Sequence, residues 1–430
     1  MTAAGPTAAL PVEPPEQLAA VLGAHLGGKV TIGAVAHEQG SSQRVAIASG
    51  SLDGRPGRWA IRSHDLASPD VERDHLALQA GVHALGAERG LETDAPLPSP
   101  EAGAHYYFDR SAARIYSVHP VLEGRTGSWE RWAWLQRQAG VPEAFGRLQA
   151  EWDACFADCT PAELRARIPA ADLDLLRAGQ PRPAFLARLR RRYEEQTEPT
   201  ARYDLASGVT NEERLARTAR DVERLATRFP LYSALFGRWL PALEEWVGQM
   251  AEEQAARMPG PLLWLQHGDP SPTNSFFVPA PSPGARVHGH VDLELVRWSR
   301  SRSDLGVAAS MRFGDDPDAV ALAGCRQGRR SRGRLALADE FRRYLHAYAG
   351  ALPRRLSLTQ AELDGLLLGL KMNVMGLVFW SARMARARLL SDQDLERYLA
   401  TQLHRLCLRG NTTVDDLRQA IGPLSGLVRD

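Results

Sequence analysis

Two short polar segments late in the chain constrain its fold and chemistry most. The first, Leu-Gln-His-Gly-Asp-Pro-Ser-Pro-Thr-Asn at 265–274, places Asp269 and Asn274 in one loop. The second, at 287–294, is a largely apolar run that leads to Asp292. A carboxylate that can hold an attacking hydroxyl, together with two oxygen ligands for magnesium, makes a minimal set for phosphoryl transfer. The two segments therefore predict a phosphoryl-transfer centre with a magnesium site.

Length and charge limit the classes of protein that this chain can represent. At 430 residues, the chain is too long for one small core and suits one large two-lobed unit or two domains. A formal net charge of +1 removes any global electrostatic argument for binding nucleic acid or a membrane surface. Lysine occurs only at Lys29 and Lys371, so arginine is the default basic residue, and a single arginine indicates a site only by its position.

The cysteines and the apolar runs favour a reduced, cytoplasmic protein. The four cysteines lack the paired spacing of a zinc site, and we expect Cys155 and Cys159 to pack in an apolar core. Segment 1–15 has neither the basic residues nor the apolar run of an export signal, and we expect it to be disordered. The most hydrophobic stretch, 366–380, is interrupted by Lys371, which predicts a buried helix and no membrane span.

The order of secondary-structure patterns predicts an α+β fold. Strand-like runs and two helical patterns fill the first 120 residues and predict a small antiparallel sheet with a helix packed against it. The sequence from 129 to 258 is almost wholly helical, the polar loop then lies between two short strands, and helices from 318 onward fill the remainder. The expected strands are 30–36, 44–48, 58–62, 105–108 and 114–118, and the expected early helices are 16–26 and 70–88.

The polar segments resemble the aminoglycoside phosphotransferase and choline kinase superfamily. In that family a His-Gly-Asp loop is followed by Asn five positions after the Asp, and His267, Asp269 and Asn274 have this register. The second family signature, an apolar strand ending in Asp with an acidic residue two places on, is similar to Val-Asp-Leu-Glu at 291–294. The alternative is a polar turn that contains Asp and Asn by coincidence, but the matching second segment favours a site.

The resemblance implies a bilobal protein kinase-like fold. Its small, β-rich N-lobe, which binds the nucleotide, is expected at 16–120. Its large helical C-lobe is expected at 121–430 and carries the catalytic loop, the metal site and the helices that bind the acceptor. Segment 1–15 precedes both lobes.

The resemblance also implies roles for the residues of the two segments. Asp269 would accept the hydrogen bond of the attacking hydroxyl and hold it in line with the γ-phosphate. His267 would orient the loop by hydrogen bonding, because this transfer needs no imidazole as a proton shuttle. Asn274 and Asp292 would hold magnesium, which prefers hard oxygen ligands, and Glu294 is a further candidate ligand.

Three features of the N-terminal part match nucleotide-binding positions of the family. Arg62, at the end of a strand-like run, lies where relatives have a basic residue that contacts the α- and β-phosphates, and Asp74 lies where they usually have the Glu that pairs with it. The alternative for this pair is an ordinary surface ion pair. The turn at Gly40, Ser41 and Ser42 would cover the phosphates with backbone N–H groups, although it is equally an ordinary hairpin turn.

Segment 116–124 resembles the interlobe hinge of the family, where extended backbone reads the edge of the adenine. Pro120 cannot donate an N–H. We therefore expect the adenine-binding backbone at its neighbours His119, Val121 and Leu122.

Together these residues predict a kinase that needs magnesium and ATP and phosphorylates a hydroxyl of a small metabolite or antibiotic. A polycationic aminoglycoside calls for a cleft lined with carboxylates, whereas this chain is rich in arginine after the metal segment. We therefore expect a neutral or acidic acceptor, with a solvated basic surface as the alternative explanation. The arginines concerned are Arg297, Arg300, Arg302, Arg326, Arg329, Arg330, Arg332, Arg334, Arg342 and Arg343.

Two other functions stay open from the sequence. One is a kinase for Ser or Thr of a ribosomally made peptide in natural-product maturation, for which 129–258 would supply the peptide groove and a partner protein is possible. The other is a non-catalytic nucleotide-binding scaffold. Loss of Asp269, Asn274 or Asp292 would have favoured the scaffold, and all three are present.

Overall fold

The residues that the computed structural model describes make up most of the chain. They are 13–39, 44–65, 69–111, 113–122, 125–126, 140–194, 211–257, 264–268, 274–278, 286–288, 291, 293, 296–299, 302, 339–368, 370, 378–379, 381, 391–410, 412–422 and 428–429.

The chain divides into two compact units, and each is described by itself. The first break between them follows Glu123. The sequence did not predict that a later helical segment, Cys159–Glu194, would group with the N-terminal sheet. Unit 1 comprises Met1–Glu123, Cys159–Glu194 and Gly289–Glu294, and unit 2 comprises Gly124–Asp158, Glu195–His288 and Leu295–Asp430.

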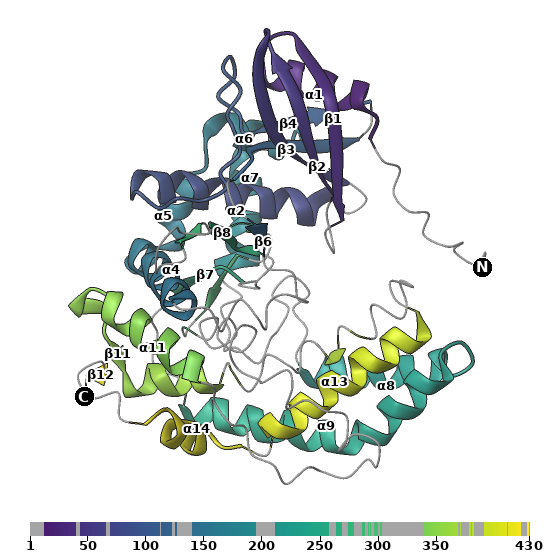
Figure 1. The fold of residues 1–430 in the computed structure, drawn as a ribbon, viewed down its shortest axis with the longest axis vertical. Coiled ribbons are helices and arrows are strands. Elements are labelled where there is room, and N and C mark those ends of the chain that lie inside the picture. The colour runs from purple at the N-terminus through teal and green to yellow at the C-terminus, as the bar shows by residue number, and fades with distance from the viewer. Residues whose placement is uncertain are drawn as a thin grey trace. The chain divides into compact units, whose positions relative to one another are not determined.

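Unit 1 is built on a five-stranded antiparallel sheet with the strand order β1-β2-β3-β5-β4 (Figure 1). Strands form at all five runs that the sequence predicted. The turn between β2 and β3 has positive φ at Asp53 (50°) and Gly54 (79°), as two-residue hairpin turns require. The strands are β1 (Val30–Gln39), β2 (Arg44–Leu52), β3 (Arg55–Asp65), β4 (Tyr106–Asp109) and β5 (Arg114–Pro120).

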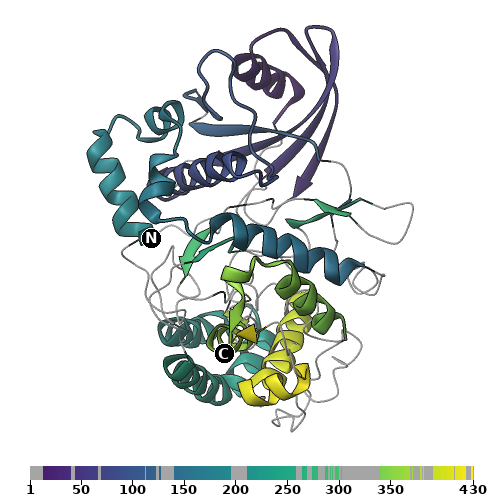
Figure 2. The ribbon, with the colours of Figure 1, turned by 90° about the vertical axis from the view of Figure 1, so that its left-hand side faces the viewer.

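Helices cover both faces of this sheet, whereas the sequence predicted a single helix packed against it. Helix α1 (Pro15–Leu26) packs on the face that carries Ile61 and Val118, which are partners in the β3–β5 register. Helix α2 (Pro69–Glu88) packs on the opposite face, together with Ile115. Figure 2 shows the two helices on opposite sides of the strands. Because side chains alternate along a strand, the sheet supplies apolar residues to two separate cores.

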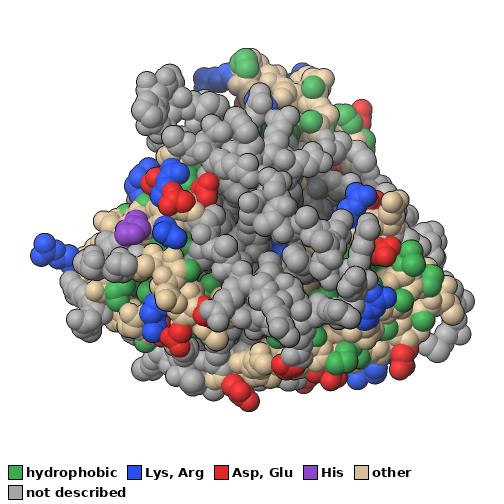
Figure 3. All heavy atoms as spheres, turned by 60° about the horizontal axis from the view of Figure 1, so that its bottom comes forward, with side chains coloured by type: hydrophobic (Ala, Val, Ile, Leu, Met, Phe, Trp, Pro, Cys, Tyr) green, Lys and Arg blue, Asp and Glu red, His purple; other side chains and the backbone are tan. Residues whose placement is uncertain are grey.

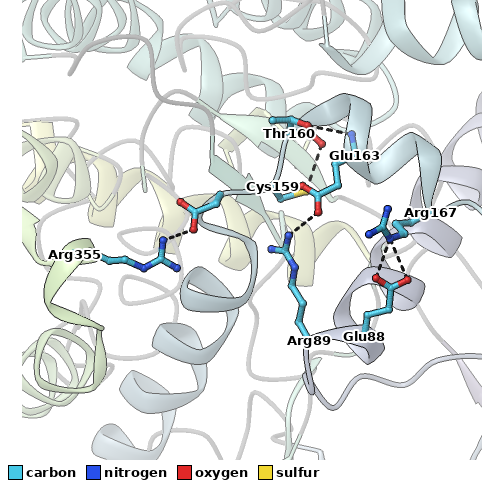
Figure 4. Close-up of polar contacts among 8 residues, drawn as sticks. Glu88, Arg89, Cys159, Thr160, Glu163, Arg167 and Arg355 are labelled. Carbon is cyan, nitrogen blue, oxygen red and sulfur yellow. Dashed lines mark hydrogen bonds and ion pairs between the residues drawn. The ribbon is translucent and has the colours of Figure 1, made fainter.

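The Cys159–Glu194 segment packs against α2. Its apolar side chains share one buried cluster with α2 and with Tyr106 of β4. Two ion pairs fix the end of α2 to α5: Arg89 with Glu163 at 2.8 Å, and Arg167 with Glu88 at 2.9 Å (Figure 4). The segment consists of α5 (Pro161–Ala166), α6 (Ala170–Leu176), α7 (Arg182–Leu189) and the π-helical turn η1 (Arg190–Glu194).

Unit 2 is mainly helical, and its core lies between α4 (Val141–Phe156) and the later helices. Helix α11 (Asp339–Ala351) approaches α4 closely at Gly146, where a Cβ atom would lie 2.3 Å from the carbonyl oxygen of Tyr344. Helix α14 begins with a capping box between Thr413 and Asp416. The remaining helices are α8 (Asn211–Leu225), α9 (Pro230–Arg257), the short η5 (Arg354–Leu356), α13 (Asp392–Gly410) and α14 (Val414–Ile421).

Short strands frame the polar loop of unit 2. The loop joins β7 to β8, as the sequence predicted. Strand β7 pairs with β10, while β8 lies between β6 and β9 in a second small sheet. A parallel pair, β11 and β12, completes the unit. The strands are β6 (Arg125–Thr126), β7 (Trp264–Gln266), β8 (Phe276–Val278), β9 (Arg286–His288), β10 (Arg297–Ser299), β11 (Leu358–Thr359) and β12 (Val428–Arg429).

Three further features concern the hydropathy of the helices, the surface charge and the cysteines. Among the described helices, none is both long enough and apolar enough to cross a membrane. On the face drawn in Figure 3, acidic and basic side chains are interspersed. Cys155 lies within α4 and is half-buried, whereas Cys159 is buried beyond the end of that helix.

Candidate functional site

The predicted site residues fall in both units, and some lie outside the part of the chain that the structure describes. Unit 1 contains Arg62, Asp74, His119, Val121 and Leu122, and unit 2 contains His267 and Asn274. Outside the described residues lie Asp269, Asp292, Glu294, Gly40, Ser41 and Ser42.

In unit 2, the strand that leads into the polar loop is anchored by a buried tryptophan of α4. The indole Nε1 of Trp152 donates a hydrogen bond to the carbonyl oxygen of Leu265 at 2.8 Å. The same ring packs against the imidazole of His267, with centroids 5.6 Å apart. Both Trp152 and His267 are buried. The start of the loop is therefore held by α4 through one hydrogen bond and one ring contact.

The loop itself begins with a glycine in the left-handed region. Gly268 has a φ of +88°, a conformation that strains any residue with a Cβ atom. At the far end of the loop, Asn274 and Ser275 are buried directly before β8. Both ends of the loop are thus fixed by buried residues of unit 2, and Asn274 brings an amide oxygen, a hard ligand atom, to this position.

Arg302 contacts the first residue of the same strand within the unit 2 core. Its guanidinium carbon lies 3.9 Å from the ring centroid of Trp264, the first residue of β7. The guanidinium donates to the hydroxyl of Tyr348 and to the carbonyl oxygen of Leu356, both at 3.0 Å, and pairs with Glu362 at 3.3 Å. Arg302 is 1% exposed. It therefore stabilises the core and cannot line an open acceptor cleft.

Two of the arginines that supported a neutral or acidic acceptor are therefore engaged in contacts within unit 2. Arg302 is buried, and Arg343 of α11 is held by a bidentate pair with Glu143 of α4 at 2.7 and 2.9 Å. Arg342 is exposed. The expectation now depends on Arg342 and on the arginines at 297, 300 and 326–334, whose side chains lie outside the described residues.

In unit 1, Arg62 is fixed on the α2-facing side of the sheet. It lies opposite Ser117 in the β3–β5 register, and its neighbour Ile61 faces α1. The guanidinium pairs with the carboxylate of Asp94 at 2.6 Å. Sequence reasoning missed Asp94, because a single Asp in the loop after α2 is a common feature of loops and does not indicate a site. Arg62 thus presents a positive charge whose orientation is set by a buried partner.

His119 is tied into the same polar cluster. Its Nδ1 donates to the carbonyl oxygen of Asp94 at 2.5 Å, and its Nε2 lies 2.8 Å from the hydroxyl of Ser117. Burial, followed by the nearby Arg62 charge, lowers the pKa of His119 well below its ordinary value, so the imidazole is neutral. Both ring nitrogens are therefore engaged inside the unit, and only the backbone of His119 is left for the expected nucleotide contact.

Asp74 has partners that the sequence did not predict. The family resemblance places Asp74 where relatives usually have the partner of the Arg62 position, whereas the ion pairs described here join Asp74 to Arg188 and Arg62 to Asp94. The Asp74 carboxylate is fully buried and accepts hydrogen bonds of 2.7 to 3.0 Å from the Nε and Nη2 groups of Arg188 in α7. Arg192 lies 3.8 Å away, and Gln180 accepts a further bond from Arg188. Asp74 therefore joins α2 to the Cys159–Glu194 segment.

Comparisons with known proteins agree with this architecture. No protein-family model and no curated protein matches the sequence. Several solved structures match nearly the whole chain, including the following two. A spectinomycin phosphotransferase in complex with ADP and spectinomycin is 10% identical, with a TM-score of 0.50, over 93% of this chain and 99% of its own. An amicoumacin kinase in complex with AMP-PNP and Ca²⁺ is 12% identical, with a TM-score of 0.51, over 92% of this chain and 93% of its own. The chain has a protein kinase-like fold.

The kinase-like fold agrees with the order of the elements described above. The five-stranded sheet with α2 precedes the mostly helical part that carries the loop between β7 and β8. At such low sequence identity the likeness concerns the fold alone. A phosphotransferase activity therefore has to be inferred from the side chains of this protein.

Proposed function

We propose that this protein is a magnesium-dependent phosphotransferase that moves the γ-phosphate of ATP to a hydroxyl of a small metabolite or antibiotic. The observation that carries the proposal is the anchored loop at 264–275 in a protein kinase-like fold. The buried residues His267 and Asn274 and the left-handed backbone of Gly268 define its two ends, and the sequence between those ends contains Asp269. A loop with rigid ends suits catalysis by positioning.

In this proposal Asp269 is the residue that handles the proton. The acceptor oxygen forms a bond to the γ-phosphorus while the bond from that phosphorus to the bridging oxygen of ADP breaks. The hydroxyl proton passes to the carboxylate of Asp269. Because the transition state of phosphoryl transfer is loose, the main task of the residue is to hold the hydroxyl in line. His267, buried against Trp152, keeps the loop oriented.

The residues proposed for the cofactor fit its chemistry. Asn274, Asp292 and Glu294 offer amide and carboxylate oxygens, the ligand atoms that magnesium prefers. When bound, the ion neutralises charge that develops on the phosphates. Arg62, held by Asp94 at 2.6 Å, supplies a fixed positive charge for the α- and β-phosphates.

The remaining nucleotide contacts are proposed for the backbone. The turn at Gly40, Ser41 and Ser42 would donate N–H groups to the phosphates. The segment after β5, with Val121 and Leu122 both half-buried, would meet the adenine edge. Neither assignment requires a particular side chain, so substitutions in these segments are expected to change nucleotide affinity less than substitution of Arg62.

For the acceptor, we propose a neutral or acidic molecule in place of a polycationic aminoglycoside. The proposal is supported by the abundance of arginine after the metal segment, where a polycationic acceptor would call for carboxylates. Arg302 and Arg343 no longer contribute to this support, because Arg302 is buried and Arg343 is paired with Glu143. A ribosomally made peptide is the second acceptor class. Comparing phosphorylation of kanamycin-type sugars with that of neutral metabolites and acidic peptides tests the preference, and efficient phosphorylation of the sugars contradicts it.

The decisive test of the activity compares ATP consumption with magnesium by the wild type and by Asp269→Ala, with and without candidate acceptors. We expect the variant to lose at least about 100-fold in kcat/KM, because an aligned catalytic carboxylate contributes several kcal/mol of transition-state stabilisation. Nucleotide affinity should stay near that of the wild type. Arg62→Met should instead weaken nucleotide binding.

A matched control is Asp415→Ala, which removes an exposed carboxylate of unit 2 that lies 3.1 Å from Arg418 of the same helix. This variant should keep wild-type turnover. If the wild type and Asp269→Ala both bind nucleotide but show equal, background turnover with every acceptor, the scaffold function replaces the kinase.

A further inference from the structure

The segment that carries two of the proposed metal ligands belongs to unit 1, unlike the sequence on either side of it. Gly289–Glu294 groups with the N-terminal sheet and α2, while the chain up to His288 and from Leu295 onward groups with unit 2. Val291 and Leu293 are buried and flank Asp292 in the sequence. What holds Val291 and Leu293 in unit 1 therefore influences the backbone on both sides of a proposed ligand.

Helix α2 provides a specific contact to this segment. The Nε2 atom of His75 lies 3.1 Å from the carbonyl oxygen of Leu293. A carbonyl oxygen only accepts, so the imidazole must donate from Nε2. Burial lowers the pKa of His75 to about 4, which keeps the ring neutral with its single proton available for this bond.

His75 is itself held in place by the Cys159–Glu194 segment. The preceding residue, Asp74, is fully buried and bound by Arg188. The ring of Tyr193 lies against the imidazole, with centroids 5.9 Å apart. The donor therefore cannot move freely along α2 or rotate without disturbing buried neighbours, as a residue that positions another group requires.

We propose that His75 is a positioning residue for metal binding: its hydrogen bond to Leu293 fixes the backbone next to Asp292 and so prepares the carboxylate for the ion. This inference rests on the proposed function, because it takes Asp292 as a metal ligand. Donors that hydrogen-bond to the metal ligands themselves typically change metal affinity by roughly 10- to 100-fold, and this donor acts on the residue next to a proposed ligand, so the lower end of that range is expected.

The test measures binding of Mn²⁺ in the presence of AMP-PNP by electron paramagnetic resonance. His75→Phe removes the donor and keeps a ring of similar size, whereas His75→Gln keeps an N–H donor. We expect His75→Phe to weaken Mn²⁺ binding by about 10-fold or more, while AMP-PNP affinity without metal changes less than about twofold. His75→Gln should restore most of the metal affinity, which a purely structural role would not predict.

His25 supplies a matched control. It is a buried histidine of unit 1 whose Nε2 lies 2.7 Å from the carbonyl oxygen of Leu97, so His25→Phe removes the same type of bond away from the metal segment. This variant should bind Mn²⁺ as the wild type does. Equal losses in His25→Phe and His75→Phe, or wild-type affinity in His75→Phe, overturn the inference.

Two further measurements separate the possible failures. If Asp292→Ala leaves Mn²⁺ binding unchanged, the proposed metal site and this inference fall together. If Asp292→Ala abolishes binding but His75→Phe does not weaken it, only the inference falls. Should His75→Phe not fold, ¹⁵N spectra of histidine side chains in the wild type decide the matter. We expect His75 to carry its proton on Nε2 and its signals to shift when metal and nucleotide bind, and a proton on Nδ1 contradicts the inference.

Discussion

Removal of the Asp74 carboxylate should strongly destabilise unit 1. Asp74→Ala leaves the guanidinium of Arg188 without the acceptor for its Nε and Nη2 groups. Breaking a buried ion pair from one side costs about 3–5 kcal/mol. The Arg188 side chain is 24% exposed and the Asp74 side chain is 0% exposed, so water partly compensates the arginine, and we expect a loss of about 3 kcal/mol.

Hydrogen exchange followed by mass spectrometry measures this loss for each helix separately. Amides of α2 should exchange roughly 100-fold faster in Asp74→Ala, while amides of α9 in unit 2 keep their rates. The double variant Asp74→Ala/Arg188→Met should recover part of the loss, because the charge of Arg188 is then no longer left without its carboxylate.

The control is an Asp–Arg pair on the surface of the same segment. Asp174 lies 3.0 Å from Arg177, and its side chain is 63% exposed. Asp174→Ala should cost less than about 0.5 kcal/mol. A change of the same small size in Asp74→Ala would refute the reasoning that burial makes the Asp74–Arg188 pair important.

Two further predictions concern acid stability and helix packing. Burial lowers the pKa of His83 to about 3 and that of His119 well below its ordinary value. The unfolded chain therefore binds protons near pH 6.5 that the folded chain does not, and the free energy of unfolding of unit 1 should fall by about 2 kcal/mol per histidine between pH 7 and 5; urea titrations that give equal values at both pH values contradict this. Gly146→Ala places a Cβ atom 2.3 Å from the carbonyl oxygen of Tyr344 and should lower the melting temperature through a loss of about 1–3 kcal/mol. The control is Gly248→Ala in α9, where an added Cβ atom would meet open space; it should leave the melting temperature unchanged or raise it. Equal effects of the two substitutions on the melting temperature would contradict the role of close helix packing at Gly146.

The parts of the fold that the sequence predicted are those with local signals. Strand-like runs predicted the positions of β1 to β5. The helical patterns at 16–26 and 70–88 predicted α1 and α2 to within a few residues. The placement of the polar loop between two short strands was also confirmed. These signals are local because period and turn chemistry are properties of neighbouring residues.

The contacts that organise the candidate site are not local, and the sequence did not predict them. Asp94 pairs with Arg62 across 32 positions, and Arg188 reaches Asp74 across 114. Each is a common residue type in a loop or a helix, so its neighbours in the sequence carry no signal of its partner. Trp152 is a similar case, because an aromatic residue at helical spacing predicts burial but not a hydrogen bond to Leu265. Such pairs follow from tertiary packing.

The most direct test of the proposed kinase activity is mass spectrometry of the products formed from ATP, magnesium and a host metabolite extract. With the wild type, a phosphorylated product should appear as ADP accumulates, and both should be absent with Asp269→Ala. A wild-type protein that binds nucleotide yet yields no phosphorylated product from metabolites or peptides, and that behaves identically to Asp269→Ala, would contradict the proposed activity.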